Sequence, residues 1–565
     1  MLAKASSYMK FHWKTLLILL FVAFFLGRIV FLNADAPLQL TWSTDPFTDE
    51  SSKSMHIRNL ELFGEKDITN LSNLCSDCVF QTAVIVDNPV VNAPLILFMN
   101  IFGVNYFAIR MISVVFGLLS LLVFFFLLKE FSNEKTALLA TALLGFNFVF
   151  LMYNRIALLE TPMTFFLIFS VFLWMKSFKQ NSLLFSILSS LAFAFALLYK
   201  PIALAFIPVF LVMQVLLFNN ANKNLKNLLI NLFLFILPIL LFIFFTPNFS
   251  VLGDVASYQG AQGFSDIART AGIFFINRMF IQMPFFLLTA FVFGFYVLIK
   301  FFEKKPFNEL EIISIVWFFS FWIFFSLRAY QPPRYLIAML PAMAVLSALF
   351  LVKLFELKKI EKISLPKSLL SKIIAIIFFL MVVFGISLYL NKFFLSNNSL
   401  EAVTSGTIYF FPIIAVIFLI LIFVFNKFLL KRLGNFFYKN LAIVLLFFML
   451  INSFIPFFLW LSNPQYSLHN ANAQIAEMNN PRIIGLWSES LCFETKFKCF
   501  AGADGTNLET VFTQLKPTHI LIGRDQRDLE TIQTYNDYES IDVLKIKEFV
   551  VGGRLVDLYQ VIYNH

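Results

Sequence analysis

Long apolar runs recur along almost the whole of this 565-residue sequence, and they limit what it can fold into. A helix needs about 20 mainly apolar residues to cross the hydrocarbon core of a bilayer. About thirteen runs approach or exceed this length. They lie near residues 15–33, 107–128, 136–153, 161–176, 183–199, 201–218, 228–246, 275–300, 310–327, 335–352, 373–391, 407–426 and 441–461. The sequence therefore predicts an all-α polytopic membrane protein with about thirteen transmembrane helices.

The composition excludes an ordinary soluble protein. Hydrophobic residues make up 59% of the chain and charged residues only 13%, whereas soluble domains carry about a quarter charged residues. The net charge of +10 does not indicate nucleic-acid binding, because the cations are spread over short segments between apolar runs. The first run, Thr15 to Leu32, is too long for a signal peptide and no small-residue cleavage site follows it. We therefore expect it to remain as the first span.

The loops between the apolar runs differ in their content of lysine and arginine. Every loop predicted on the side of the N-terminus holds at least two cations, as at Lys129 and Lys135, whereas the alternate loops are poorer in cations for their length. Because cytoplasmic loops carry the excess of lysine and arginine, we expect a cytoplasmic N-terminus in a cell membrane. Two loops, about 34–94 and about 247–271, and the tail from Ser462 are then outside.

The chain changes character at about residue 461. Residues 1–461 form the predicted transmembrane module, and residues 462–565 form a predicted extracytoplasmic α/β domain. Short β-like runs in this tail are Arg482–Trp487, His519–Gly523, Phe549–Val551 and Leu555–Ile562, with a helical pattern at Asn507–Leu515. Gly552 and Gly553 lie between the last two runs, which predicts a tight hairpin turn.

The four cysteines form two close pairs, Cys75 with Cys78 and Cys492 with Cys499. On the predicted topology all four lie outside the cytoplasm, where disulfides persist. Two local disulfides are the first prediction, and a metal site built on thiolates is the alternative.

The first outside loop has apolar residues at helical spacing, which predicts a short helix at the membrane surface. These residues are Met55, Ile57, Leu60, Leu62 and Phe63. Thr48 or Asp49 is the predicted N-cap of this helix, and Gly64 its end.

Ionisable residues gather at the outer ends of the predicted spans. They are Asp49 and Glu50 in the first outside loop, Arg155 and Glu160 in YNRIALLETP, Lys200 in LYKP, Arg269 in the second outside loop, and Arg334 in PPRY. Carboxylates and cations from separate loops on one surface predict a catalytic cleft at the membrane face. The alternative is that such charges reach toward lipid headgroups, which is the predicted role of Arg28, Arg110 and Arg278. Likewise, an Asp49-Glu50 pair can simply begin a helix.

The order of these segments resembles the GT-C superfamily of glycosyltransferases, in particular the group of protein O-mannosyltransferases and the lipid A aminoarabinose transferase (families 39 and 83). The resemblance covers about residues 10–460. It rests on Asp49-Glu50, NPVVNAPLILFMNIFGVNYFAIRMISVVFG, YNRIALLETP, Lys200-Pro201 and PPRYLIAMLPAMAVL. Two departures from the aminoarabinose transferases favour a neutral sugar such as a hexose. Ser52 replaces a basic residue, and Asn92-Ala93-Pro94 replaces a lysine before a Pro-Pro pair.

The resemblance implies an inverting glycosyltransferase that moves a hexosyl or pentosyl group from a polyprenyl-monophosphate donor to a lipid, glycan or protein acceptor outside the cytoplasm. The implied roles are general base for Asp49, helper for Glu50, phosphate ligands for Lys200, Arg334, Arg155 and Arg269, and support for Glu160, Tyr335 and Asn92. The chemistry agrees, because an attacking hydroxyl or amine needs a carboxylate to take its proton. A departing lipid phosphate needs cations.

Two questions stay open at this point. The expected enzyme requires no cofactor, and a divalent metal with His56 as one ligand is the alternative. A transporter or flippase for a lipid-linked sugar is the rival function. Such proteins tend to have internal repeats and midplane polar residues, whereas here no repeat is evident and the polar residues cluster at the outer span ends. The acceptor motif typical of oligosaccharide-transferring GT-C enzymes, WWDYG, is absent.

Overall fold

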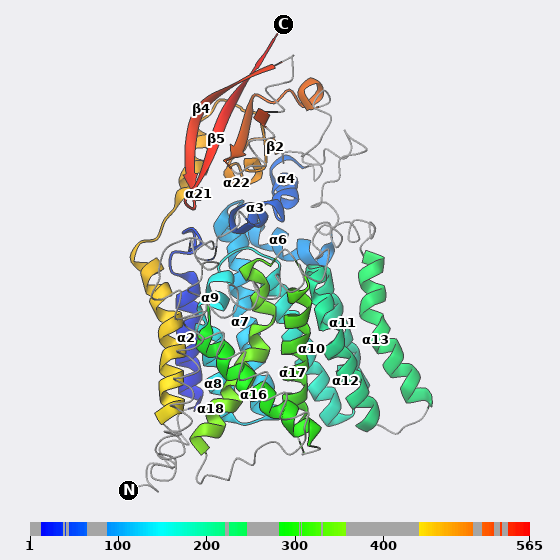
Figure 1. Ribbon diagram of the computed structural model, residues 1–565. Helices are drawn as coiled ribbons and strands as arrows, with labels where there is room; N and C mark the ends of the chain where they lie inside the picture. The colour runs from blue at the N-terminus through cyan, green and yellow to red at the C-terminus, as the bar shows by residue number, and fades with distance from the viewer. Residues whose placement is uncertain are drawn as a thin grey trace, which may run out of the picture.

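The computed structural model consists of a helical bundle with a small sheet domain standing on one end of it (Figure 1). It describes residues 13–37, 40, 45–64, 88–220, 225–245, 282–303, 306, 308–328, 331–356, 440–500, 511–524, 532–533 and 541–564. The bundle helices are α2 (Trp13–Ile29), α6 (Pro89–Phe102), α7 (Tyr106–Phe131), α8 (Glu134–Phe146), α9 (Phe148–Tyr153), α10 (Glu160–Gln180), α11 (Leu183–Tyr199), α12 (Ile207–Asn220), α13 (Leu225–Phe245), α16 (Pro284–Phe302), α17 (Glu309–Ser326) and α18 (Leu340–Glu356). Residues 440–462 are also helical.

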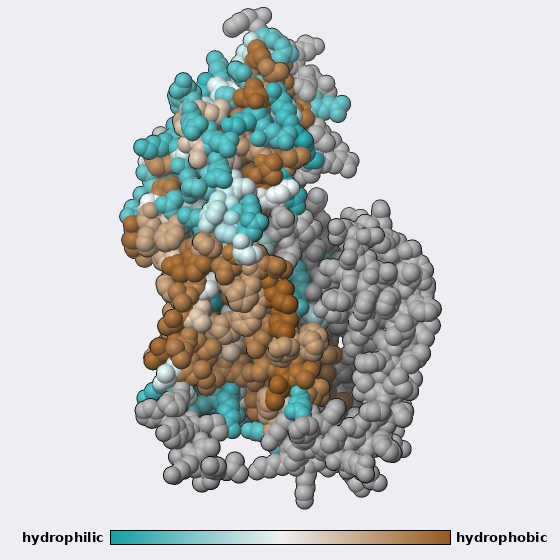
Figure 2. Space-filling model, turned by 90° about the vertical axis from the view of Figure 1, so that its left-hand side faces the viewer, coloured by the Kyte–Doolittle hydropathy of each residue, from teal (hydrophilic) through white to brown (hydrophobic). Residues whose placement is uncertain are grey.

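Six stretches of the described chain are long and apolar enough to cross a membrane. They are Tyr106–Phe131, Glu160–Gln180, Pro201–Phe218, Pro284–Phe301, Glu309–Ser326 and Asn440–Ala476. The bundle exposes a band of apolar side chains below the hydrophilic domain (Figure 2), as a lipid-facing surface does. These features confirm a multi-pass membrane protein. The number of about thirteen spans is not confirmed, and the runs at 373–391 and 407–426 lie outside the described residues.

Asparagine side chains determine where several of these helices begin. Asn88, Asn105, Asn133 and Asn147 each accept a hydrogen bond from the backbone N–H three residues on, and Asn308 forms a full capping box. The cap at Asn147 divides the run predicted as one span at 136–153 into α8 and α9. Lys200-Pro201 separates two of these helical segments, because α11 ends at Tyr199 and a 3-10 turn, η4 (Pro201–Phe206), follows.

Segment 45–64 forms two short helices, α3 (Asp45–Ser52) and α4 (Met55–Phe63), instead of the single helix predicted. Asp49 therefore lies inside α3, and the prediction of Thr48 or Asp49 as the N-cap is wrong. Ser54 occupies that position before α4. Gly64 ends α4 as predicted, with φ of 72° in the left-handed region that glycine adopts most readily.

The C-terminal domain is a small α/β unit, as predicted. Its elements are α21 (Ser467–Ala476), β1 (Ile483–Ile484), α22 (Ser488–Leu491), β2 (Cys499–Phe500), the π-helical turn η9 (Val511–Leu515), β3 (His519–Gly523), β4 (Ile541–Val551) and β5 (Arg554–Tyr563). The strand order is β2-β1-β3-β5-β4, with β1 parallel to β2 and β3 and with β5 antiparallel to β3 and β4.

Two local predictions for this domain are confirmed. Gly552 and Gly553, with φ of 55° and 76°, form the turn between β4 and β5. Cys492 and Cys499 form a disulfide. The predicted pair of Cys75 and Cys78 lies outside the described residues. β4 begins eight residues before the predicted strand (541 against 549), because β5 pairs with it along its whole length.

Candidate active site

The C-terminal domain is held against α3 and α4 by buried polar and aromatic contacts. Phe47 stacks on Trp487 with ring centroids 6.3 Å apart. The hydroxyl groups of Ser51 and Ser490 lie 2.9 Å apart, and the Ser490 hydroxyl also donates to the Phe47 carbonyl at 3.0 Å. These contacts join residues more than 400 positions apart into one end of the molecule.

Arg58 on α4 makes the densest of these contacts. Its Nε donates to the carbonyl of Phe493 at 2.8 Å, and its Nη2 to the carbonyls of Cys492, Thr495 and Phe497 at 3.0, 2.6 and 3.0 Å. The disulfide between Cys492 and Cys499 closes the loop that supplies these carbonyls. Arg58 is therefore a buried clamp between the two parts of the chain.

Four charged side chains meet at the end of the bundle where the domain docks. Asp49 comes from α3, Glu160 is the first residue of α10, Lys200 joins α11 to η4, and Arg334 lies in the 3-10 turn η6 (Pro333–Ala338). Arg334 Nη1 donates to Asp49 Oδ2 at 2.6 Å, and Arg334 Nε is ion-paired with Glu160 Oε1 at 3.0 Å. Lys200 Nζ donates to the same Glu160 oxygen. We call Asp49, Arg334, Glu160 and Lys200 the four-charge cluster.

Two side chains of the four-charge cluster are buried, and the other two are partly exposed. The side chains of Glu160 and Arg334 are 0% and 5% exposed, whereas those of Lys200 and Asp49 are 17% and 27% exposed. Two cations share one oxygen of Glu160, which compensates the cost of burying that carboxylate. A molecule that approaches the cluster from solvent would therefore meet Asp49 and Lys200 first.

The electrostatic surroundings keep Asp49 ionised. Burial raises the pKa of the Asp49 carboxyl, but the guanidinium of Arg334 and the ammonium groups of Lys53 and Lys200 outweigh that effect. The pKa of Asp49 is therefore below its ordinary value. The carboxylate can accept a proton only weakly while Arg334 holds it.

Glu50 points away from the four-charge cluster into a separate buried ion pair. Its carboxylate accepts from Arg110 Nε at 2.7 Å and Nη2 at 2.8 Å, and from the Ala157 backbone N–H at 2.8 Å. Arg110 also donates to the carbonyls of Leu32 and Ala34. The prediction that Arg110 reaches lipid headgroups is wrong, because its guanidinium is buried and bonded inside the protein.

Two other arginines stabilise the end of α2. Arg155 donates to the carbonyls of Gly27, Arg28 and Phe31, and its guanidinium lies 4.3 Å from the Trp460 ring centroid. Arg155 thus satisfies helix-end carbonyls and is not brought to the four-charge cluster. Arg28 is also buried, with hydrogen bonds to Asn154 and to the Gly145 carbonyl, which overturns its predicted headgroup role. Arg269 and Arg278 lie outside the described residues.

Of the predicted supporting residues, Tyr335 adjoins the four-charge cluster. The Tyr335 ring lies 5.4 Å from Lys200 Nζ and 5.6 Å from the Arg334 guanidinium, and it stacks on Phe325. Asn92 on α6 forms a 2.7 Å hydrogen bond with His56 Nε2 on α4. Within the described ranges, no group of three or more His, Cys, Asp or Glu side chains is placed to hold a metal ion.

Two residues beside the cluster are absent from the predicted site. Lys53 acts electrostatically on Asp49 and is itself influenced by Lys200, Arg334 and Glu489. It follows Asp49 by one helical turn, so its spacing could have signalled it. Glu489 comes from α22 of the C-terminal domain, and nothing in the local sequence connects it to Asp49.

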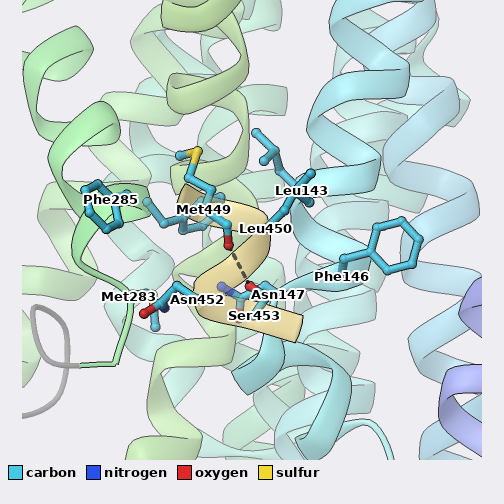
Figure 3. Close-up of a pocket in the computed structure, with 10 residues that line it drawn as sticks. Leu143, Phe146, Asn147, Met283, Phe285, Met449, Leu450, Asn452 and Ser453 are labelled. Atoms are coloured by element: carbon cyan, nitrogen blue, oxygen red, sulfur yellow. Dashed lines mark hydrogen bonds between the residues drawn. The ribbon is translucent and has the colours of Figure 1, made fainter. Parts of the chain in front are cut away.

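A small pocket lies inside the bundle, and no residue of the four-charge cluster lines it (Figure 3). Its lining residues are Leu143, Phe146, Asn147, Met283, Phe285, Phe286, Met449, Leu450, Asn452 and Ser453. Ser453 donates to the Met449 carbonyl at 3.1 Å, and Asn452 donates to the Gln282 carbonyl at 2.8 Å. These lining residues are apolar or uncharged.

Part of the chain resembles a described protein family. Residues 87–249 match the family described as dolichyl-phosphate-mannose-protein mannosyltransferase. An uncharacterized protein of Aquifex aeolicus is 28% identical over 273 residues, which are 47% of this chain and 53% of that protein. The match thus spans about half the length of that relative.

Two solved structures share the fold. The crystal structure of ArnT from Cupriavidus metallidurans bound to undecaprenyl phosphate superposes with a TM-score of 0.53 and 14% identity, covering 96% of this chain and 97% of ArnT. The apo structure of the same protein gives a TM-score of 0.51 with 98% coverage of both chains. The chain therefore has the fold of ArnT, which with the family match at 87–249 confirms its resemblance to the protein mannosyltransferase and ArnT group of the GT-C glycosyltransferases.

Proposed function

We propose that this protein is an inverting glycosyltransferase that moves a sugar from a polyprenyl-monophosphate donor to an acceptor at the extracytoplasmic membrane face. The observation that carries the proposal is the four-charge cluster, in which one partly exposed carboxylate adjoins two cations from separate loops. This is the combination that the reaction requires, since a nucleophile must lose a proton while a phosphate departs.

In the proposed reaction Asp49 is the general base. It accepts the proton of an acceptor hydroxyl or amine as that atom attacks the anomeric carbon of the donor sugar. A bond forms from the acceptor to the anomeric carbon, and the bond from that carbon to the phosphate oxygen breaks on the opposite side. The electron pair leaves with the polyprenyl phosphate, and attack from the opposite side inverts the configuration.

Arg334 and Lys200 are the proposed ligands of the donor phosphate. Arg334 contacts both Asp49 and Glu160. A phosphate that takes one edge of this guanidinium would weaken its hold on Asp49, and the pKa of Asp49 would then rise toward its ordinary value. Donor binding and activation of the base are thereby coupled through one side chain. Lys53 is a third cation within electrostatic reach.

Charges at the opposite end of the bundle support the proposed orientation. α7 begins at Tyr106, whose backbone N–H donates to Glu494 of the C-terminal domain, and it ends near Lys129. Lys176 and Lys179, in the last turns of α10, form ion pairs with Glu130 near that same end. Cations of short loops thus lie away from the four-charge cluster, as expected if the cluster faces outside.

For the donor and for the acceptor we propose a chemical class. The sequence departures at Ser52 and Asn92 favour a neutral sugar such as a hexose, and the acceptor is a lipid, a glycan or a protein. The fit of Asp49, Arg334 and Lys200 to the reaction involves no metal, so we propose a metal-independent enzyme.

A donor panel tests the proposal. Purified protein is incubated with a set of polyprenyl-phosphate sugars and simple acceptors, and release of polyprenyl phosphate is measured in the presence and absence of EDTA. We expect one neutral-sugar donor to be consumed with or without EDTA. If donors bind but none is consumed, and reconstituted vesicles move the lipid-linked sugar across the membrane, the protein is a flippase instead.

A further inference from the structure

Glu489 is a buried carboxyl group beside the four-charge cluster that the proposed reaction does not use. Its residue is 8% exposed, and no ion pair to it is seen among the residues that the structure describes. Glu160, by contrast, has two cations on one oxygen. A buried acid without a close counter-ion is costly in its ionised form, which favours the protonated form.

The backbone around Glu489 is firmly anchored. On one side, the Ser488 hydroxyl donates to the Gly485 carbonyl at 2.7 Å. On the other side, the Ser490 carbonyl accepts from the Tyr106 hydroxyl at 2.8 Å and from Asn472 at 2.9 Å. Ser490 also joins α22 to α3 through Ser51. Glu489 therefore projects from a fixed turn of the C-terminal domain that is packed on the helix carrying Asp49.

Three charged groups act on the Glu489 carboxyl: Lys53, Arg58 and Asp49. Arg58 is committed to the four backbone carbonyls of the 492–497 loop, and Asp49 to Arg334. Lys53 forms no ion pair within 4.0 Å in the described part of the chain, although it lies within the fields of both Asp49 and Glu489. Lys53 is thus the cation that can respond to a change at either carboxyl group.

The protonation of Glu489 changes near neutral pH. Burial raises the pKa of Glu489 to about 7, while Lys53 and Arg58 oppose this rise. When Glu489 is ionised, two carboxylates compete for the Lys53 ammonium. When Glu489 is protonated, the surroundings of the four-charge cluster have one negative charge fewer, and Lys53 is available to another anion.

We propose that Glu489 is a positioning residue of the donor site, and that through Lys53 it determines the affinity of this site for a lipid phosphate. This inference rests on the proposed function. It makes the C-terminal domain a part of the donor site. An anion bound beside Lys53 favours the protonated form of Glu489, so binding takes up a proton and weakens as the pH rises through neutrality.

The probe for this inference is undecaprenyl methyl phosphate, a phosphate diester. A diester carries one negative charge throughout the range tested, whereas a phosphate monoester has a second pKa of about 6 and would titrate itself. Binding is measured from pH 6 to pH 8 at constant ionic strength, with full-length protein in phosphatidylcholine nanodiscs. The variants are Glu489→Gln and Glu477→Gln, the latter at an exposed glutamate of the same domain.

For the wild type we expect the dissociation constant to rise roughly 3- to 10-fold from pH 6 to pH 8, since one pKa unit corresponds to a factor of ten. Glu489→Gln should change less than about 2-fold and bind as the wild type does at pH 6. Glu477→Gln should follow the wild type. Lys53→Gln should bind more weakly at all pH values and also lose the slope, which keeps the test decisive if Glu489→Gln fails to fold.

The other possible results contradict either the role of Glu489 or the proposed function. If the wild type is flat, or if Glu489→Gln or Lys53→Gln keeps the wild-type slope, the role of Glu489 is wrong while the proposed function stands. If the wild type binds no diester at any pH, the proposed donor class falls, and the inference falls with it.

Discussion

Arg334 donates a hydrogen bond to Asp49 across 2.6 Å, although the two residues lie 285 positions apart in the sequence. The proposed base is therefore neutralised by a proposed phosphate ligand. This pairing keeps a partly buried carboxylate stable and holds both side chains in place before substrate arrives. It also predicts that donor binding and base activation change together when either partner is altered.

Replacing Arg334 with alanine should weaken donor binding by roughly 10- to 100-fold, because a hydrogen bond to a charged group is worth about 1.5–3 kcal/mol. The loss leaves Glu160 with Lys200 as its remaining ion-pair partner among the described residues. Equilibrium binding of the donor to the purified variant measures this. Lys200→Ala should also weaken binding, and unchanged affinity in both variants would mean that the phosphate binds elsewhere.

Replacing Glu50 with glutamine should affect stability more than chemistry. Its carboxylate forms a bidentate ion pair with Arg110, and removing one partner of a buried pair costs about 3–5 kcal/mol. We expect a lower midpoint of thermal unfolding, with near-normal turnover in the fraction that remains folded. The double variant Glu50→Gln with Arg110→Met should recover part of the loss. A folded Glu50→Gln protein without turnover would restore Glu50 to the catalytic role predicted from the sequence.

Replacing Cys492 with serine should loosen the C-terminal domain. The disulfide closes the loop whose carbonyls hold Arg58, and opening a loop of this length costs roughly 2–3 kcal/mol in the chain-entropy model. Limited proteolysis should then cut the domain faster than in the wild type. Equal proteolysis rates for the two proteins would show that the clamp does not depend on the disulfide.

Stability should fall between about pH 5 and pH 8 through Glu489. Burial raises the pKa of this group from 4.5 to about 7. The folded protein therefore holds the proton more tightly, and this contribution is complete below the ordinary pKa and is lost as the pH rises through about 7. Thermal unfolding midpoints of the wild type should decline over this range by more than those of Glu489→Gln. Parallel curves for the two proteins would contradict the assigned burial.

The sequence predicts that three members of the four-charge cluster lie together, because each of them borders an apolar run. Glu160, Lys200 and Arg334 all stand where a span must begin or end, and that position alone brings them to one face. Periodicity also predicts the apolar helices and the Gly552-Gly553 hairpin, since these depend on local chemistry. Such features can be recognised without knowledge of the tertiary structure.

Other features depend on partners that are distant in the sequence. Nothing near Glu50 identifies Arg110 as its partner, and nothing near Arg155 shows that the end of α2 takes up its donors. Residues 45–64 form two helices, and Phe47 in the first of them stacks on Trp487 from the other end of the chain. The place of Glu489 could not be predicted from the sequence for the same reason, since it is the docking of α22 on α3 that brings it near Asp49.

The central claim, that Asp49 is the base of a lipid-phosphate-dependent sugar transfer, is tested most directly by Asp49→Asn. Donor binding and turnover of this variant are measured beside the wild type and beside Glu477→Gln, an exposed glutamate of the C-terminal domain. We expect donor affinity equal to or tighter than the wild type, because Arg334 is released for the phosphate. Turnover should fall about 10²- to 10⁴-fold, the usual contribution of a general base. Turnover within a few-fold of the wild type would show that another group takes the proton.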